Sequence, residues 1–344
     1  MSDALFDHPS QRDDWLDLTT ETALDPDQPI VDAHHHLWAR ENFGYLLDAF
    51  TDDVVASGHN VVASVYAECT SGWEESGRPD NLRAVGEARF VAAERQSTRR
   101  GPLADPLAGY VAYLDALDES TVRQAIEAHR AVPGARLLGF RQSATWDPDP
   151  AVKVIARTPP AGLLASDEFA RGFRHIAEAG LTFDAWVFHT QLGDVEQLAQ
   201  RFPGTTIVLD HAGGPIGLGG YRDAEVFPAW ATALRRLAAR PNVHLKFGGL
   251  AMPLRGEHWH EDERPPGSDV LAEHWAPWFT EAIEAFGTAR TMFESNFPVD
   301  RISGHYGTLW NAFKRLAAAL SEDEKDQIFR TTAVHTYGLR LTSR

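Results

Sequence analysis

Residues 182–214, TFDAWVFHTQLGDVEQLAQRFPGTTIVLDHAGG, contain the pattern that decides the fold. Two short apolar runs, 182–188 and 206–209, have the length and composition of buried strands. Between them, residues 194–202 place apolar side chains at helical spacing. Two buried strands joined by a helix are typical of neighbouring parallel strands, because a crossover connection is needed to return the chain to the same edge of a sheet.

The same alternation runs along the whole chain. Strand starts recur about every 37 residues, which is enough for one strand, one helix and two loops. Eight such units predict the α/β class and a single (β/α)8 TIM barrel. An open doubly wound sheet is the alternative, and the lack of a glycine-rich phosphate-binding motif after the first strand weakens it. Further strands are predicted at 30–31, 61–67, 110–114, 137–140, 243–247 and 291–293, and helices at 121–129, 167–179, 226–239, 270–286 and 323–337.

The barrel is expected to be one domain, residues 29–344, preceded by an acidic leader segment, residues 1–28. Two loops, 71–80 after strand 2 and 251–268 after strand 7, are longer than a barrel needs. Loops that follow strands form the active-site face of a barrel, so we expect both to be walls or lids of the substrate site. A surface insertion without function is the alternative.

Charge and cysteine content exclude several classes of protein. The 344 residues include 32 Lys and Arg against 49 Asp and Glu, a net charge of −17. Such a chain would be repelled by nucleic acid and by anionic membranes. One cysteine, Cys69, allows no intrachain disulfide, and no run approaches the ~18 apolar residues of a membrane span. We therefore expect a cytoplasmic protein with a small-molecule substrate, and homo-oligomerisation stays open.

The first predicted strand ends in a histidine pattern that suits a metal ion. In residues 31–38, VDAHHHLW, side chains two apart share a face, so Asp32, His34 and His36 point the same way. Neutral imidazole binds Zn, Mn, Fe and Ni. His189 and His211 follow the fifth and sixth strands, and in a closed barrel these strand ends converge on one mouth.

Four segments of the chain form a recognisable set: IVDAHHHLW (30–38), GFRQ (139–142), FPGTTIVLDHAGGP (202–215) and MFESNFPVD (292–300). Together they resemble the amidohydrolase superfamily, and more narrowly its amidohydrolase-2 group of TIM-barrel lactonases and related metal-dependent hydrolases. The resemblance covers residues 29–337. It implies hydrolysis of a lactone, although some relatives decarboxylate aromatic or muconate-like acids.

The chain departs from the family pattern at Asn296, where the family usually has an aspartate that binds metal and acts as general base. The resemblance leaves His34, His36 and His189 as ligands of one divalent ion, Zn or Mn, while metal-independent catalysis stays open. An amide cannot accept a proton. The general base is therefore expected among three other residues, and Asn296 could donate its N–H to the oxyanion. In order of preference the base candidates are His211, Glu294 and Glu68.

A polar or anionic lactone needs cationic and hydrogen-bonding side chains. Arg141, at the end of the fourth strand, is the first choice, because guanidinium binds carboxylate through two hydrogen bonds. Lys246 and Trp186 are expected to be core residues. His258 and His260, in the long seventh loop, are expected to be a surface pair. The other predicted substrate-binding residues are Glu68, Arg301, His305 and Tyr306.

The expected activity is that of a hydrolase, in which water attacks the carbonyl of a small lactone. Two alternatives remain at this point. One is a metal-dependent decarboxylase of the same superfamily, which the loss of the aspartate disfavours. The other is a catalytically inactive barrel that binds a small molecule, which the four retained histidines disfavour.

Overall fold

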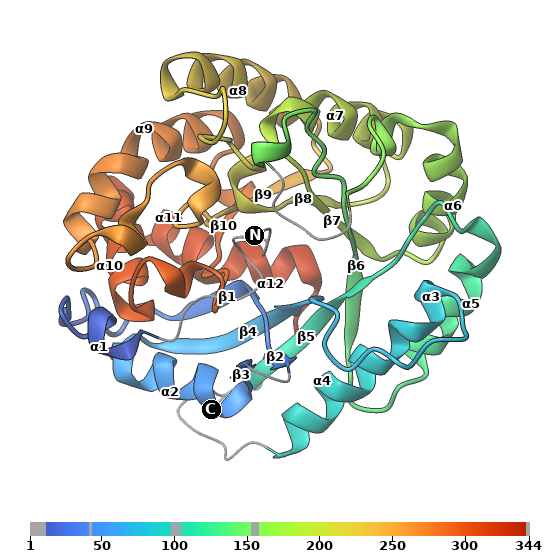
Figure 1. Cartoon of the computed structure of the whole chain (residues 1–344), viewed down its shortest axis with the longest axis horizontal. Coiled ribbons are helices and arrows are strands. Elements are labelled where there is room, and N and C mark those ends of the chain that lie inside the picture. Colours follow the sequence, from blue (N-terminus) through green and yellow to red (C-terminus); the bar gives the residue numbers. More distant parts are fainter. Residues whose placement is uncertain (1–11, 41–42, 98–102, 104, 153–157, 342–344) are drawn as a thin grey trace.

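Eight parallel strands form the predicted barrel (Figure 1). The computed structural model describes residues 12–40, 43–97, 103, 105–152 and 158–341. The strands follow one another around the sheet in chain order, and every neighbouring pair is parallel. They are β1 (Ile30–His35), β4 (Val61–Ala67), β5 (Asp105–Tyr113), β6 (Leu137–Ser143), β7 (Thr182–Trp186), β8 (Ile207–Leu209), β9 (Val243–Phe247) and β10 (Thr291–Phe293).

Helices surround the sheet (Figure 1), and a small antiparallel hairpin of β2 (Trp38–Arg40) and β3 (Phe43–Tyr45) follows β1. All the predicted strands and helices are present, so the prediction of a (β/α)8 barrel is confirmed. The helices are α1 (Asp13–Leu16), α2 (Leu47–Ser57), α3 (Asp80–Arg83), α4 (Val85–Ser97), α5 (Glu119–Arg130), α6 (Asp167–Glu178), α7 (Leu192–Arg201), α8 (Asp223–Ala238), α9 (Ser268–Phe286), α10 (Tyr306–Leu316), α11 (Glu322–Asp326) and α12 (Thr332–Tyr337).

The last predicted helix, 323–337, differs from the prediction, since it is divided into three parts. A π-helical turn at Gln327–Thr331 separates α11 from α12. Ile328 and Phe329 of this turn are buried. The first turn of α11 is capped by Ser321, whose hydroxyl accepts a hydrogen bond from the backbone N–H of Glu324.

The barrel closes between β1 and the residues that follow β10. The backbone N–H of Asn296 donates to the carbonyl of His34 (2.9 Å), and that of His36 donates to the carbonyl of Phe297 (2.7 Å). The Asp32 carboxylate also accepts the backbone N–H of Ser295 (2.9 Å). The two predicted motifs at the ends of the first and last strands are therefore joined directly.

Helix α12 covers the other end of the barrel. Ala333, Tyr337 and Leu339 pack against inward-facing side chains of the strands, among them Val31 and Met292. Most of these interior side chains are small, which leaves room for a helix to fill this end. The core therefore continues from the strands into the C-terminal helix.

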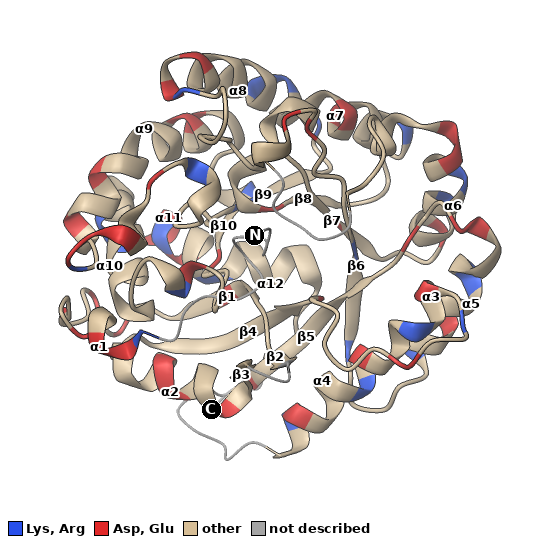
Figure 2. Ribbon diagram, in the orientation of Figure 1, with Lys and Arg blue, Asp and Glu red and all other residues tan. Residues whose placement is uncertain are grey.

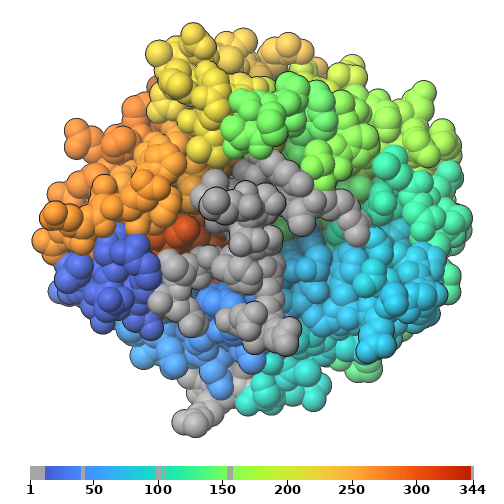
Figure 3. All heavy atoms as spheres, in the orientation of Figure 1, coloured from blue at the N-terminus to red at the C-terminus, as the bar shows by residue number. Residues whose placement is uncertain are grey.

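The leader, described from residue 12, lies along the loop that follows β9 (Figures 1 and 3). Trp15 Nε1 donates to the carbonyl of Asp262 (2.9 Å), and the Thr19 hydroxyl donates to that of Pro265 (2.8 Å). Lys314 on α10 donates to the carbonyls of Leu24 and Asp25 (both 2.5 Å). The leader is thus tied to the barrel, and its separation as a segment of its own stays a prediction.

Charged residues of both signs lie on the outer helices (Figure 2). Many form ion pairs on this surface, for example Arg236 with Glu196 (2.8 Å). In the described part of the chain no helix is both long and apolar enough to cross a bilayer.

Gly172 in α6 offers a test of the packing between α6 and the loop after β5. A Cβ atom at this position would lie 2.0 Å from the carbonyl oxygen of Ala116. We expect Gly172→Ala to lower the free energy of unfolding in urea by about 1–3 kcal/mol, because the backbone must shift to accept the methyl group. Gly193→Ala in α7 is the matched control: it has open space and should stabilise the protein by about 0.5–1 kcal/mol. Equal effects of the two substitutions would contradict this packing.

Candidate active site

Four histidine and acidic side chains meet where the strands end on one face of the barrel. His34 and His36 come from the end of β1, His211 from the turn after β8, and Glu294 from the residue after β10. All four are almost completely buried. The ring centroids of His34 and His211 lie 4.7 Å apart. The structure therefore brings together three of the four predicted histidines and two of the three predicted bases, His211 and Glu294.

His34 and His36 face each other through their Nε2 atoms, which are 3.2 Å apart. His36 Nδ1 donates to the carbonyl of Ala67 (2.9 Å), so its Nε2 carries the lone pair when the ring is neutral. Burial lowers the pKa of His36 well below its ordinary value, and the nearby charges of His34 and Arg141 lower it further. His36 is therefore a neutral acceptor at pH 7.

His211 is held by Glu294. Glu294 Oε1 accepts both the backbone N–H of His211 (2.8 Å) and its ring Nδ1–H (2.8 Å). Burial raises the pKa of Glu294, but the charges of His211 and His34 and their hydrogen bonds outweigh it, and the net shift is downward. The hydrogen bond at Nδ1 leaves Nε2 as the nitrogen of His211 that can accept a proton. Trp186 packs edge-on against the imidazole, with 4.6 Å between the ring centroids.

The backbone around this pair is unusual. His211 has a φ of 54°, in the left-handed region that non-glycine residues rarely adopt. Gly249 lies against its ring, where a Cβ atom would come within 2.6 Å of Nδ1. A Cβ at Gly248 would lie 2.5 Å from Cγ of Glu294. Two glycines after β9 thus allow the His211–Glu294 pair to sit against the strand end.

Beneath His34 lies an interior network of buried charges. Lys246 Nζ is 2.6 Å from Asp184 Oδ2, 3.1 Å from Asp210 Oδ1 and 3.1 Å from His34 Nδ1. Burial lowers the pKa of Lys246, but the two aspartates outweigh it and the net shift is upward. Tyr337 of α12 donates its hydroxyl to Asp184 (2.7 Å). Lys246 is therefore a fixed interior cation, in agreement with the expected structural role.

Arg141 and Glu68, both predicted to bind substrate, bind each other. Arg141 Nε donates to Glu68 Oε1 (2.9 Å), and Nη2 donates to the backbone carbonyl of Glu68 (2.8 Å). Its remaining Nη1 lies 3.3 Å from His34 Nε2 and 3.6 Å from Asp210 Oδ2. The guanidinium faces the site, but its Nε and Nη2 donors, which together could bind a substrate carboxylate, are already bound to Glu68.

Two buried oxygens in the site have neither a hydrogen-bond donor nor an ion-pair partner among the described residues. One belongs to a carboxylate and one to an amide, so each could accept a hydrogen bond from a hydroxyl group or coordinate a cation. They are Asp184 Oδ1 and Asn296 Oδ1.

The other predicted substrate-binding residues have protein partners. Tyr306 is buried and donates its hydroxyl to Asp32 Oδ2 (2.9 Å). Arg301 pairs with Asp13 of the leader (2.8 Å), and also with Asp53. His305 Nε2 lies 3.2 Å from Asp17 Oδ1. Their roles in substrate binding stay predictions, and leader residues already contact the last two.

His189 is placed away from the other predicted metal ligands. Its Nδ1 accepts the backbone N–H of Ile216 (3.4 Å), and its ring lies edge-on to Tyr221. Among the described residues, the buried group of potential ligands whose atoms all lie within 4.8 Å of one another is instead His34, Asp210 and His211. The role of His189 as a ligand stays a prediction.

Sequence reasoning missed Asp184, Asp210 and Asp300. Asp210 lies beside Arg141 and Asp300 binds Asn296, both predicted site residues, while Asp184 pairs with Lys246 beneath His34. Asp210 directly precedes His211 in the quoted motif. Asp184 interrupts an apolar strand, which is a signal of a buried functional or structural carboxylate. Asp300 could have been found only as the residue one helical turn beyond Asn296.

The donor set fits a divalent cation. Two imidazole nitrogens 3.2 Å apart match the separation of neighbouring ligands around one ion, with about 2.0–2.1 Å from each nitrogen to zinc. Asp210 is buried beside His34 and His211 and offers a carboxylate oxygen within 4.8 Å of their ring nitrogens. His34 and His36 would hold the ion, with Asp210 or His211 as the further ligand.

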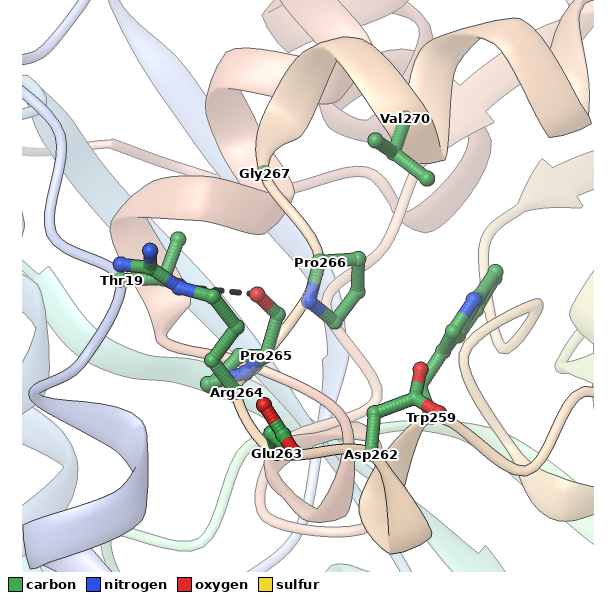
Figure 4. Close-up of a pocket in the computed structure, with 9 residues that line it drawn as sticks. All are labelled: Thr19, Trp259, Asp262, Glu263, Arg264, Pro265, Pro266, Gly267 and Val270. Atoms are coloured by element: carbon green, nitrogen blue, oxygen red, sulfur yellow. Dashed lines mark hydrogen bonds between the residues drawn. The ribbon is translucent and has the colours of Figure 1, made fainter.

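Two surface features lie outside this site. His258, His260 and Glu261 form an exposed group after β9, as expected of a surface pair, with imidazole–carboxylate distances of 3.8 Å. A pocket of about 450 Å³ lies between Thr19 of the leader and the same loop (Figure 4). Its other lining residues are Trp259, Asp262–Gly267 and Val270, so no predicted catalytic residue borders it.

The barrel and its histidine cluster define a hydrolase of the amidohydrolase type. The chain belongs to the amidohydrolase family, whose profile matches residues 31–339. An uncharacterised protein of Sinorhizobium fredii, y4mH, is 28% identical over 340 residues, 90% of this chain and 99% of that protein. An L-fucono-1,5-lactonase of Burkholderia multivorans is 32% identical over 207 residues, which is 60% of this chain and 64% of that enzyme.

Among solved structures, the chain is similar to an amidohydrolase from Burkholderia multivorans with bound zinc. The TM-score is 0.67 at 25% identity, covering 90% of this chain and 99% of that chain. These relatives support lactone hydrolysis in coarse terms and a divalent metal as a candidate cofactor.

Zinc binding can be tested by thermal unfolding of the untagged protein. We expect added Zn²⁺ to stabilise the wild-type protein by about 2.7 kcal/mol at a concentration 100-fold above Kd, and EDTA to reverse the effect. His36→Ala should lose most of this stabilisation because it removes one of two facing ligands. His258→Ala/His260→Ala, which removes the surface group, should keep it. The opposite pattern would place the zinc on the surface loop.

Proposed function

We propose that this protein hydrolyses a small, neutral, polyhydroxylated lactone, with His211 as general base. The observation that carries the proposal is the hydrogen bond between Glu294 and His211 Nδ1, which directs the other ring nitrogen away from the carboxylate. A histidine oriented by a carboxylate accepts protons well near neutral pH. The lactonase relative supports the reaction class.

In the proposed reaction, His211 Nε2 takes a proton from a water molecule while the oxygen of that water attacks the lactone carbonyl carbon. Glu294 stabilises the imidazolium that forms. When the tetrahedral intermediate collapses, the bond to the ring oxygen breaks and His211 returns the proton to that oxygen, which gives a hydroxy acid. Arg141 Nη1, beside His34, provides positive charge near the developing oxyanion. A divalent cation on His34 and His36, when bound, supplies Lewis-acid polarisation of the carbonyl.

The charges of the site favour a neutral substrate. Two cations, Arg141 and Lys246, are both paired with carboxylates. Asp184, Asp210, Glu68 and Glu294 provide four carboxyl groups. A substrate carboxylate would find no unpaired cation among these residues, whereas the buried oxygens without donors suit hydroxyl groups. Of the two kinds of substrate expected from the sequence, a polar lactone and an anionic lactone held by Arg141, the anionic one is therefore less supported.

The alternatives have less support. Solved decarboxylases share the fold at 13% identity or less, which carries no argument about the reaction. An inactive binding barrel does not need the carboxylate that orients His211. The oriented histidine therefore favours a hydrolase.

His211→Asn is expected to lower kcat/KM for lactone opening by about 10²–10⁴-fold, because proton transfer is lost. Glu294→Gln should lower kcat by about 10–100-fold with little change in KM, because the hydrogen bond can persist but the negative charge is lost. His175→Asn on the surface of α6 is the control. Full turnover by His211→Asn, measured by acid release in a weakly buffered indicator assay, would remove His211 from the mechanism.

Substrate charge can be tested with a panel of lactones at one pH. We expect L-fucono-1,5-lactone and other neutral aldono-1,5-lactones to be hydrolysed with a kcat/KM at least about 100-fold above that of 2-pyrone-4,6-dicarboxylate. Preference for the dicarboxylate would mean that Arg141 leaves Glu68 to bind substrate. Raising the salt concentration distinguishes this case, since salt screens the interaction of the protein with a charged substrate and leaves a neutral substrate almost unaffected.

A further inference from the structure

Asn296 and Asp300 form a buried pair at the mouth of the barrel. Asn296 Nδ2 donates to Asp300 Oδ1 (2.8 Å), and the exposed fractions of the two residues are 1% and 2%. Asp300 Oδ2 accepts the backbone N–H of Ala251, where the long seventh loop begins (3.2 Å). The carboxyl group of Asp300 thus joins the last strand end to that loop.

This arrangement decides which end of the Asn296 amide faces away from Asp300. With its NH2 group bound to Asp300, Asn296 turns its Oδ1 atom to the other side, where it is buried and has no donor among the described residues. The backbone N–H of Asn296 is bound to His34, so the residue is fixed beside the histidine cluster. While Asp300 is ionised, a rotated amide would place its oxygen 2.8 Å from a carboxylate oxygen. Burial raises the pKa of Asp300 well above its usual value, although the hydrogen bonds from Asn296 and Ala251 oppose this shift, so the orientation is best tested at alkaline pH.

We propose that Asp300 is a positioning residue that makes Asn296 a hydrogen-bond acceptor in the active site, for a substrate hydroxyl group or the attacking water. The inference rests on the proposed lactone hydrolysis for its ligand. It reverses the expectation from the sequence that Asn296 donates an N–H to the oxyanion. Asp300 itself does not contact substrate, and it acts only through the orientation of Asn296.

Asp300→Asn reverses this orientation with almost no change in volume. The amide introduced at position 300 must offer its oxygen to the N–H of Ala251, so its NH2 group faces Asn296. Asn296 then has to turn its own oxygen toward position 300, and its NH2 group toward the site. The variant therefore presents a donor where the wild-type protein presents an acceptor.

The exchange N296D/D300N restores an acceptor. The amide at position 300 keeps its bond to Ala251 and donates to one oxygen of the carboxylate at position 296, whose second oxygen faces the site. N296D alone instead places two buried carboxyl groups 2.8 Å apart. N296D alone should therefore lower the stability of the protein. D300N, added to N296D, should restore it because it removes one of the two carboxyl groups.

The test combines stability with kinetics on L-fucono-1,5-lactone or the best neutral lactone. We expect N296D to lower Tm at pH 8 by roughly 5–10 °C and N296D/D300N to recover most of that loss. We expect D300N to lower kcat/KM by about 10–100-fold, and the exchange variant to recover at least about half of that loss on a logarithmic scale.

The two readouts separate the possible failures. The stability cycle requires no substrate, so it tests the Asn296–Asp300 pair even if no lactone is hydrolysed. If the Tm change of N296D/D300N equals the sum of the changes of N296D and D300N, positions 296 and 300 do not interact and the proposal is wrong. Unchanged kcat/KM in D300N, or equal losses in D300N and the exchange variant, would show that the orientation of Asn296 has no role in the reaction.

Discussion

Closure of the barrel between β1 and the segment after β10 is the constraint on which the rest of the structure depends. Two backbone hydrogen bonds, from Asn296 to His34 and from His36 to Phe297, join the first and last units of the chain. The same residues carry the candidate chemistry. The geometry of the site is therefore fixed by the backbone that completes the sheet, and loops are not needed to bring these side chains together.

The four buried carboxyl groups of Asp184, Asp210, Glu68 and Glu294 need positive charge close to them inside the barrel. Lys246 and Arg141 supply two cations, and His34 lies between them with one ring nitrogen near each. Such a network is costly to assemble, and removal of one member leaves another charge buried and unpaired. It also leaves a few oxygens without donors, and these are the atoms to which a polar ligand can bind.

Much of this could be predicted from the sequence because strand ends and barrel topology determine which residues converge. The eight strands, His34, His36, His211 and Glu294 follow from that rule. The pairing between side chains could not be predicted in this way. Arg141 binds Glu68 and Arg301 binds Asp13 of the leader, and contacts between residues about 70 to 290 positions apart depend on how the whole chain packs. His189 follows the right strand, yet its ring turns to Tyr221.

The hydroxyl of Tyr337 connects the C-terminal helix to the interior network through Asp184. Its ring also lies 5.4 Å from the ammonium group of Lys246. Across evolution, substitution at any one of these three positions would leave a buried charge or hydroxyl group without its partner. Homologues should therefore replace Tyr337, Asp184 and Lys246 together, and this correlated change would mark which members of the family share this barrel interior.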